Sequence, residues 1–551
     1  MTSFDEIVDV IVVGSGSAAL SAALTAARRG KRVLVLEKTA YLGGTSAMSG
    51  AGTWVPANHH MLAAGIEDSP DNAWRYLRAT ARDGWREDED TLWKAFADHA
   101  PKMLAFLEAN TPLEFEMIDE PDIFAEREGG IEYGRMLSTK PIRRGVAAGL
   151  RRHIRRPPWP QIFSYKEAQS LNFFRQPLRS AIAFAPRFVR RYLLDERAQG
   201  NALIAGLLAG CQAAGCRFYR ETPAEAPILD ATDRVVGVRA SQGGKPLRLG
   251  ARLGVVLASG GFEWNTAWRE QYFPGPYDRS GSPNGNVGDG QRIAQEAGAA
   301  LARMDQANVY PTIPTTYEGR LQGLPMTIQA DPHAIAVNAE GKRFASEYDF
   351  NFFEALDARD PATGAPVNLP VWLVADSRSF ATLPVFRYFA RQQQGWLIKA
   401  PSIEALAGRM GIPAPALAQT IERFNALCRN GKDEDFQRGE GLWERHKSGA
   451  RRGLAGNPAL GGIDAAPFYA VPFNRSILGT KGGARTNAHG QVLRGDGSTI
   501  PGLFAAGLTM ANPIGTRAVG PGTTIGPCLT WGYICGNRIA ESQPADIPGA
   551  R

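Results

Sequence analysis

The sequence predicts an α/β protein with a Rossmann-like nucleotide-binding domain, and three local observations lead to this prediction. An apolar run at 8–13 has the composition of a buried parallel strand. The turn after it reads GSGSAA, a GxGxxA pattern, and an alanine-rich helix is expected over 20–29. A second apolar strand is expected over 32–36, and it ends at an acid about twenty residues past the turn.

This unit has the parts that hold a dinucleotide. Gly14 and Gly16 allow a tight turn and the close approach of a pyrophosphate to a helix N-terminus. The acid at the end of the second strand, Glu37, is placed to accept hydrogen bonds from ribose hydroxyls. A glycine-rich turn alone predicts little, whereas strand, turn, helix, strand and acid in this order predict a nucleotide site.

A second loop of small residues points to the kind of nucleotide. Residues 42–46 read LGGTS and residues 49–52 read SGAG. Nicotinamide dehydrogenases have no need of such a loop after the acid, whereas a bulky isoalloxazine ring must lie against backbone. Further elements of strand and small residues follow at 252–262, 286–290, 502–507 and 520–526. The sequence therefore predicts a flavin nucleotide.

Length and composition exclude several classes of protein. The 551 residues allow two to four domains. No apolar run reaches about 18 residues, so no spanning helix is expected, and no secretion leader opens the chain. The five cysteines form no CxxC pair and are expected to be free thiols, and no His/Cys/Asp cluster has metal-ligand spacing. We expect a cytoplasmic protein without a metal.

The basic charge is concentrated in one segment, 141–197. The chain carries a net charge of +7, but this segment has thirteen basic residues against three acidic ones, so the rest carries −3. The basic residues are Arg143, Arg144, Arg151, Arg152, Arg155, Arg156, Lys166, Arg175, Arg179, Arg187, Arg190, Arg191 and Arg197. Aromatic residues interleave with them: Trp159, Phe163, Phe173, Phe174, Phe184 and Phe188. Two interpretations stay open, a helical cover over a pocket and a peripheral contact with an anionic membrane. No nucleic-acid module accompanies the patch, so nucleic acid is not an expected partner.

Taken together, the motifs resemble a known family over essentially the whole chain. They read VDVIVVGSGSAALSAAL, VLVLEKTAYLGGTSAMSGAGTWVP, VVLASGGFEWN, VGDG, PFYAV, GTKGG, GLFAAG and GPGTTIGP. The chain resembles the fumarate reductase/succinate dehydrogenase flavoprotein superfamily, and within it the 3-ketosteroid dehydrogenase branch. The resemblance implies FAD and a discontinuous FAD-binding domain, 1–304 and 479–551. It also implies an inserted α+β catalytic or cap domain at 305–478 that closes a cleft over the flavin.

The resemblance also implies roles for individual residues. The pyrophosphate is expected at Gly14, Gly16 and Ala19, and the adenosine ribose at Glu37 with Lys38 beside it. The remaining expected FAD contacts are Gly44, Thr45, Ser46, Gly50, Gly52, Asp289, Gly507, Thr524 and Ile525. The histidine that carries covalent FAD in some relatives has no counterpart before Gly43, so FAD is expected to be noncovalent.

Departures from the family pattern argue against a dicarboxylate substrate. Fumarate reductases place a histidine before the threonine of an HTxGG element, and Gly479 stands there in this chain. Their general-acid arginine lies four residues past an aspartate, a spacing that reaches Phe380 here, with Arg378 two residues early. Because a small dicarboxylate needs paired cations, succinate or fumarate chemistry is not expected.

The ketosteroid branch removes two hydrogens beside a ketone. A backbone N–H and a tyrosine polarise the carbonyl, a tyrosinate takes the α-proton, and the β-hydrogen passes as hydride to flavin N5. Gly522 fits the backbone donor, but the three tyrosine positions of the branch hold Ala518, Asn351 and the Asp122-Ile123-Phe124 stretch.

The candidate catalytic residues follow from these replacements. Tyr348, three residues before Asn351, is the first candidate base and Tyr310 is the second. Arg517 is a candidate polariser of the carbonyl in place of the missing hydroxyl. His333 and His489 are interpreted as loop residues.

The functional hypothesis is an FAD oxidoreductase that forms or reduces a C=C bond conjugated to a ketone. The expected substrate is an apolar, cyclic, steroid-like ketone, with an electron acceptor that the residues do not identify. One alternative is an α,β-unsaturated acid reductase of the same superfamily. The other is a non-catalytic flavin-binding protein that docks on a membrane or a partner.

Overall fold

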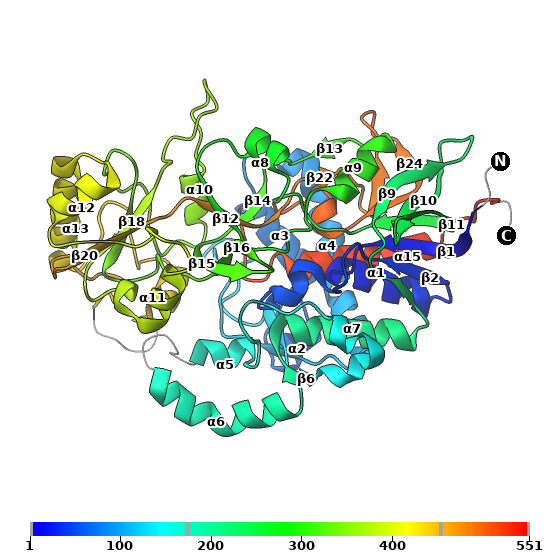
Figure 1. The fold of residues 1–551 in the computed structure, drawn as a ribbon, viewed down its shortest axis with the longest axis horizontal. Coiled ribbons are helices and arrows are strands. Elements are labelled where there is room, and N and C mark those ends of the chain that lie inside the picture. The colour runs from blue at the N-terminus through cyan, green and yellow to red at the C-terminus, as the bar shows by residue number, and fades with distance from the viewer. Residues whose placement is uncertain (1–3, 171–176, 451–455, 548–551) are drawn as a thin grey trace.

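The computed structural model describes residues 4–170, 177–450 and 456–547. The molecule is elongated, with a large sheet at the end that carries both termini and a smaller sheet at the opposite end (Figure 1). Segments from both ends of the chain, blue and red in Figure 1, lie side by side in the large-sheet half.

The large sheet consists mainly of parallel strands. These strands are β1 (Glu6–Val13), β2 (Val33–Leu36), β8 (Arg217–Tyr219), β9 (Ala224–Leu229), β10 (Val235–Gln242), β11 (Lys245–Leu257), β23 (Gln491–Leu493) and β24 (Thr499–Ala505). The order is β23-β24-β11-β1-β2-β8, and β10 and β9 continue antiparallel from β11. β1 pairs in parallel with both β2 and β11 and is almost entirely buried, as its apolar sequence predicts. The α/β class with a Rossmann-like sheet is confirmed.

Two helices from opposite ends of the chain pack together beside this sheet, α1 (Ser17–Arg28) and α15 (Ile525–Ala540). Glycines allow the close approach, because a Cβ at Gly532 would lie 2.3 Å from the carbonyl oxygen of Ala18. Other helices of this half are α2 (His59–Ala63), α3 (Pro70–Thr80), α4 (Arg86–Asn110), α7 (Gln199–Ala213) and α9 (Asp289–Glu296). Helix α8 (Thr266–Tyr272) packs through Trp268 and Tyr272 against a core of the smaller-sheet half.

The smaller sheet separates two hydrophobic cores. Its strands are β17 (Ala334–Val337), β18 (Trp372–Ala375), β19 (Ile398–Ala400) and β20 (Phe468–Pro472), all antiparallel in the order β17-β18-β20-β19. Ile335 and Val337 face the core that includes α12 (Ile403–Met410) and α13 (Ala414–Asn430). The alternate residues Ala334 and Ala336 face the core that includes α10 (Phe352–Leu356) and α11 (Pro384–Ala390).

Short strands connect the two halves. They form the groups β12-β21-β14, β15-β16, β13-β22 and β3-β5-β4. Their bounds are β3 (Thr53–Trp54), β4 (Phe115–Met117), β5 (Met136–Thr139), β12 (Tyr277–Ser280), β13 (Leu301–Ala302), β14 (Ala307–Val309), β15 (Thr312–Tyr317), β16 (Arg320–Pro325), β21 (Arg475–Thr480) and β22 (Gly483–Ala484). β21 crosses the predicted boundary at 478/479 and pairs with strands on both sides of the predicted boundary at 304/305. Both domain boundaries stay a prediction.

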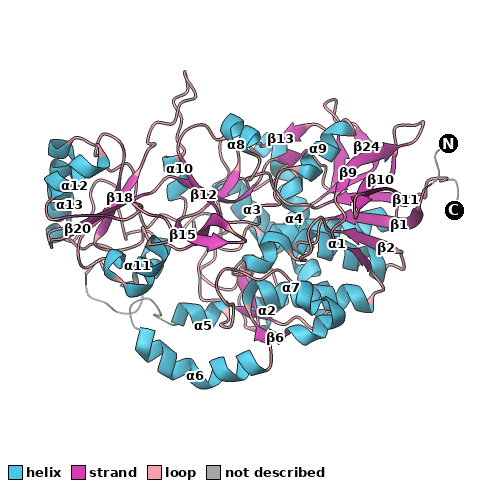
Figure 2. Cartoon of the chain, viewed as in Figure 1, coloured by secondary structure: helices cyan, strands magenta, loops and turns pink. Residues whose placement is uncertain are grey.

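The basic segment 141–197 leaves and rejoins the body through the paired strands β6 (Ile142–Arg143) and β7 (Glu196–Arg197). Between them lie the 3₁₀ segment Arg144–His153 and the helices α5 (Tyr165–Ser170) and α6 (Pro177–Leu193). Figures 1 and 2 show α6 at the rim of the molecule. Phe173, Phe174 and Arg175 lie outside the described residues. All five cysteines are free, and no helix among the described residues is long and apolar enough to cross a bilayer.

Candidate functional site

A cavity of about 520 Å³ opens at the carboxyl ends of the parallel strands. Val13, Leu36 and Ala258, at or just past the ends of β1, β2 and β11, contribute to its wall. This edge of a parallel sheet is where ligands bind in open α/β folds. The cavity continues toward the smaller-sheet half, where Leu324 and Phe353 also line it.

The first glycine turn forms the floor of this cavity. Gly14 has φ +107°, and a Cβ there would lie 2.3 Å from the carbonyl oxygen of Ala258, so only glycine fits. Gly16 is the N-cap residue of α1 and supplies no side-chain acceptor to the first amides of the helix. Both glycines line the cavity. Ala19 does not line it but is fully buried, where a small residue lets α1 pack closely on the sheet.

The predicted ribose-binding acid is held in place by its neighbours. Ser15 Oγ donates to Glu37 Oε2 at 2.5 Å, and Thr39 N–H donates to Oε1 at 2.8 Å. Lys38 Nζ lies 2.5 Å from Asp289 Oδ2 at the start of α9, so this ion pair joins two segments of the cavity wall. Glu37, Lys38 and Asp289 all line the cavity.

The second small-residue loop also reaches the cavity. Gly44, Thr45, Ser46, Gly50 and Gly52 line it. Ser46 Oγ accepts from Ser17 N–H at 3.1 Å, and Thr45 Oγ1 accepts from Asn286 Nδ2 at 3.0 Å, so the loop is tied to both walls.

The C-terminal turn completes the wall next to this loop. Gly507, Gly522, Thr524 and Ile525 line the cavity, and α15 starts there. Gly522 has φ +87°, and a Cβ would lie 2.6 Å from the carbonyl carbon of Gly52. Among hydrogen bonds between described residues, none uses the Gly522 N–H.

The arrangement fits FAD. Two helix N-termini without side-chain caps, those of α1 and α15, border the cavity. A Cβ at Gly44 would meet nothing within 4 Å, so there is open space beside the backbone. Helix N-termini favour phosphate oxygens, and a glycine-lined wall suits a flat ring. The FAD contacts of the individual residues stay predictions.

The structure places only two of the four predicted catalytic residues in the cavity lining. Tyr310 and Gly522 line the cavity, whereas Tyr348 and Arg517 do not. Tyr348 is 4% exposed and packs 4.8 Å beneath the guanidinium of Arg438, a buried position away from the cavity lining. Arg517 Nε lies 2.7 Å from Glu354 Oε2, so its charge is already paired.

Sequence reasoning missed two groups in this region. Tyr165, the first residue of α5, lines the cavity, and its hydroxyl donates to Glu120 Oε2 at 3.4 Å. Glu120 Oε1 lies 2.5 Å from Lys447 Nζ. Tyr165 stands within the Arg/Phe-rich segment, and Glu120 lies two residues before the replaced tyrosine position at 122–124. No spacing in the sequence links the two.

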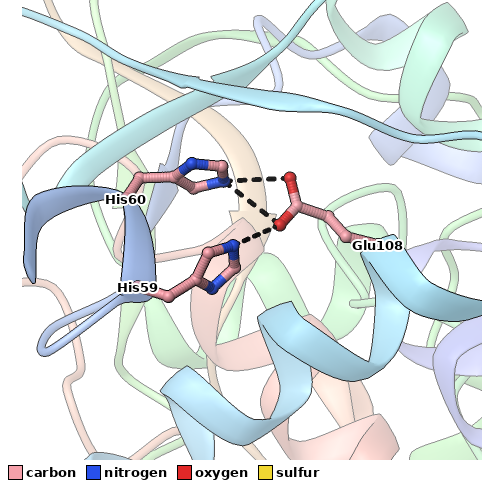
Figure 3. A group of neighbouring side chains, drawn as sticks. All are labelled: His59, His60 and Glu108. Carbon is pink, nitrogen blue, oxygen red and sulfur yellow. Dashed lines mark hydrogen bonds and ion pairs between the residues drawn. The ribbon is translucent and has the colours of Figure 1, made fainter. Parts of the chain in front are cut away.

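A cluster outside the cavity has side chains that bind metals elsewhere. His59 and His60 of α2 and Glu108 of α4 bring potential ligand atoms within 4.8 Å of one another (Figure 3). His59 Nε2 lies 2.8 Å from Glu108 Oε2, and His60 Nε2 lies 3.0 Å from Oε1. Sequence spacing gave no signal for this cluster. The shared carboxylate accounts for the proximity of the two imidazoles without an ion.

Comparisons with known proteins agree with the site. Residues 9–525 match the family described as FAD binding domain. The chain is 34% identical to the 3-oxosteroid 1-dehydrogenase of Mycobacterium tuberculosis (strain ATCC 25618 / H37Rv), over 97% of this chain and 98% of that protein. It is 35% identical to the 4-oxocyclohexanecarboxylate 2-dehydrogenase of Sinomonas cyclohexanicum, over 98% and 94%.

A solved structure shares the whole architecture. The 3-ketosteroid delta1-dehydrogenase from Sterolibacterium denitrificans, in complex with 1,4-androstadiene-3,17-dione, superposes with a TM-score of 0.85. The two chains are 30% identical, and the match covers 97% of this chain and all of that one. The predictions of FAD as cofactor and of the superfamily are therefore confirmed. The chain belongs to the FAD binding domain family, within the FAD-dependent CH–CH dehydrogenases that include the 3-oxosteroid 1-dehydrogenases.

Proposed function

We propose that this dehydrogenase introduces a C=C bond beside the carbonyl of a cyclic, steroid-like ketone. The observation that carries the proposal is the unused amide N–H of Gly522, on a cavity wall made with the small-residue loop. The relatives described above are named for cyclic oxo compounds, which supports a ring ketone as the substrate class.

The chain supplies donors for the ketone oxygen. The Gly522 N–H and the Tyr310 hydroxyl are the proposed donors, and a donor aimed at a developing enolate oxygen contributes about 3–4 kcal/mol. Burial, followed by the negative charge of Glu120, raises the pKa of Tyr310. Tyr310 therefore stays protonated near neutral pH and suits a donor better than the base role expected from the sequence. Bound FAD supplies the two-electron acceptor for the β-hydrogen.

The cavity offers little to a dicarboxylate. Lys38 is paired with Asp289, and Arg155 with Glu318. Lys481 Nζ donates to Gly515 O at 2.6 Å, and burial lowers its pKa to about 8. A histidine at Gly479 would require the Leu508 side chain to move, since a Cβ there lies 2.5 Å from Leu508 Cδ1. These contacts support a ketone over an unsaturated acid.

Anaerobic mixing of the FAD-loaded enzyme with a panel of compounds tests this function. The panel holds 4-androstene-3,17-dione, 4-oxocyclohexanecarboxylate and succinate, and fumarate is added separately to enzyme reduced with dithionite. We expect the two ketones to bleach the visible absorbance of the oxidised flavin. Succinate should leave the oxidised flavin unchanged, and fumarate should not restore the absorbance of the reduced flavin. Reaction with succinate or fumarate and with neither ketone would overturn the proposal in favour of an unsaturated acid reductase. An unchanged flavin absorbance with every compound would favour the non-catalytic alternative.

We also propose a peripheral membrane contact through α6. Ile182, Val189, Tyr192 and Leu193 are each more than half exposed on this helix, and Arg187 and Arg190 stand among them. Apolar side chains beside arginines on an exposed helix suit an anionic bilayer surface. The segment also contributes Arg155, Trp159 and Tyr165 to the cavity lining, which supports the pocket-cover interpretation for its first half.

Cosedimentation with vesicles tests this contact. Vesicles containing phosphatidylserine should bind the wild type but not a Val189→Ser, Leu193→Ser double variant with unchanged FAD content. Equal binding of wild type and variant, or binding to neutral phosphatidylcholine vesicles alone, would contradict an electrostatic and apolar contact through α6.

A further inference from the structure

Tyr165 is held at the cavity by its own helix start. Ser164 and Glu167 bond reciprocally, since Ser164 N–H donates to Glu167 Oε2 at 2.9 Å and Glu167 N–H donates to Ser164 Oγ at 3.2 Å. Glu167 also accepts from Arg191 of α6, at 2.5 Å and 3.0 Å. The position of Tyr165 is therefore fixed by the fold of the basic segment.

The ring of Tyr165 lies over the loop expected to line the flavin. A Cβ at Gly50 would lie 3.2 Å from ring atoms Cδ2 and Cε2 of Tyr165, so a larger residue at Gly50 would push the ring away. Tyr165 and Gly50 line the same cavity. A ketone held against this loop therefore has the Tyr165 side chain within the same enclosure.

A buried carboxylate stands behind the phenol. The Glu120 side chain is 1% exposed and accepts from Tyr165 Oη at 3.4 Å, a long hydrogen bond of the kind that tightens when a substrate binds. Its other oxygen is paired with Lys447 of α14 (Leu442–Ser448), whose side chain is 34% exposed. The carboxylate thus bridges a cavity hydroxyl and a cation that reaches solvent.

The same charges argue against a free tyrosinate. Burial, then the negative charge of Glu120 and the neighbouring Tyr310, raise the pKa of Tyr165 well above its usual value. A phenol next to a carboxylate stays protonated at rest, because a phenolate would be repelled by the carboxylate charge. It can still accept a proton from the substrate while it passes its own proton to the carboxylate.

We propose that Tyr165 and Glu120 act together as the proton acceptor of the site, an inference that rests on the proposed ketone dehydrogenation. The α C–H bond of the ketone breaks and its proton bonds to Tyr165 Oη, while the phenolic proton moves to Glu120 Oε2. The electron pair of the broken α C–H bond would form the new C=C bond, and bound FAD would supply the acceptor for the β-hydrogen and its electron pair. The proton then leaves the Glu120 carboxyl toward solvent beside Lys447. Tyr165 is a catalytic residue in this scheme, and Glu120 acts through it.

Hydrogen exchange at the α-carbon isolates this step from the redox reaction. The FAD-loaded enzyme is reduced with dithionite in D₂O, which blocks hydride removal, and deuterium uptake beside the carbonyl is followed by NMR. The probes are 4-androstene-3,17-dione and 4-oxocyclohexanecarboxylate. The variants are Tyr165→Phe and Glu120→Gln. The control is Tyr469→Phe, a buried hydroxyl outside the cavity lining that also has a 3.4 Å hydrogen bond, from Arg387.

We expect both variants to slow exchange about a hundredfold or more, with FAD content and ketone affinity retained and the control at the wild-type rate. Exchange at the wild-type rate in Tyr165→Phe would overturn the role of Tyr165 and Glu120 as proton acceptor while leaving the proposed function intact. If the wild-type enzyme exchanges the α-hydrogens of neither ketone, and neither ketone reduces its flavin, both the proposed function and the proposed proton acceptor are overturned. If Tyr165→Phe loses FAD, the Glu120→Gln variant provides the test. Slow exchange in that variant supports the proposed proton acceptor, and exchange at the wild-type rate overturns it.

Discussion

The side-chain amide of Asn351 makes two hydrogen bonds to the backbone of Ala518. Asn351 Oδ1 accepts from Ala518 N–H at 2.8 Å, and Nδ2 donates to Ala518 O at 3.0 Å. Both residues line the cavity, and both stand where the resemblance to ketosteroid dehydrogenases leads one to expect a tyrosine. The pair joins the start of α10 to the turn that carries Gly522, so these two positions hold the turn in place instead of supplying hydroxyls.

Asn351→Ala should therefore loosen the Gly522 turn. Two hydrogen bonds are lost, and at about 0.5–1.5 kcal/mol each the free energy of unfolding should fall by about 1–3 kcal/mol. Urea unfolding followed by tryptophan fluorescence measures the change, and FAD content reports on the turn. Asn110→Ala is the control, since it removes one bond to Phe106 O at a helix end outside the cavity lining. Equal FAD affinity in both variants would contradict the role given to Asn351.

Gly522→Ala should lower FAD affinity about tenfold or more, equivalent to about 1.4 kcal/mol. The residue has φ +87°, and a Cβ would press on the backbone of Gly52 at 2.6 Å, so two walls of the cavity must separate. Gly319→Ala is a matched control with φ +74° and nothing within 4 Å of the added carbon. Titration of both apoproteins with FAD makes the comparison. Similar FAD affinities of the two variants would show that the contact between residue 522 and Gly52 does not affect FAD binding.

Most of the residues predicted to contact FAD line the cavity, because the sequence features that identify them are local. Gly14 and Gly16 sit in one turn between one strand and one helix, so backbone geometry and spacing determine them together. Lys38 and Asp289 are 251 residues apart, and each was expected separately to contact FAD, but their ion pair was not foreseen.

The catalytic half was harder to predict because its groups come from distant loops. Tyr348 is the first candidate base because it is close in sequence to a family position, yet its ring packs under the guanidinium of Arg438. Glu120 and Tyr165 meet only because α5 packs beside β5, a tertiary contact that no periodicity or motif encodes.

FAD should leave the protein on denaturation. No histidine is among the described residues that line the cavity, and Cys528, which does line it, has its thiol pKa raised by burial to about 12. A thiol that keeps its proton is a poor nucleophile toward a flavin. Precipitation with trichloroacetic acid should leave all the yellow colour in the supernatant. Colour retained in the washed pellet would show a covalent bond and contradict the expectation of noncovalent FAD.

Glu444, one turn before Lys447 on α14, should make the protein less stable as pH rises. Burial, and more weakly the carboxylate of Asp349, raises the pKa of Glu444 from the usual 4.5 to about 7, against the opposing hydrogen bonds from Ser346 and Gly439. Between these two values the folded protein holds a proton that the unfolded chain has released. The contribution of Glu444 to the free energy of unfolding therefore falls as pH rises across this window, by up to about 3 kcal/mol at ~1.4 kcal/mol per pKa unit.

Glu444→Gln should flatten this dependence, because an amide does not titrate. Urea unfolding at about pH 4 and about pH 8 brackets the window, and the wild type should lose stability relative to the variant between the two. Glu422→Gln, at an exposed position of α13, is the control and should keep the wild-type slope. Parallel pH profiles for wild type and Glu444→Gln would show that the pKa of Glu444 is not raised in the folded protein.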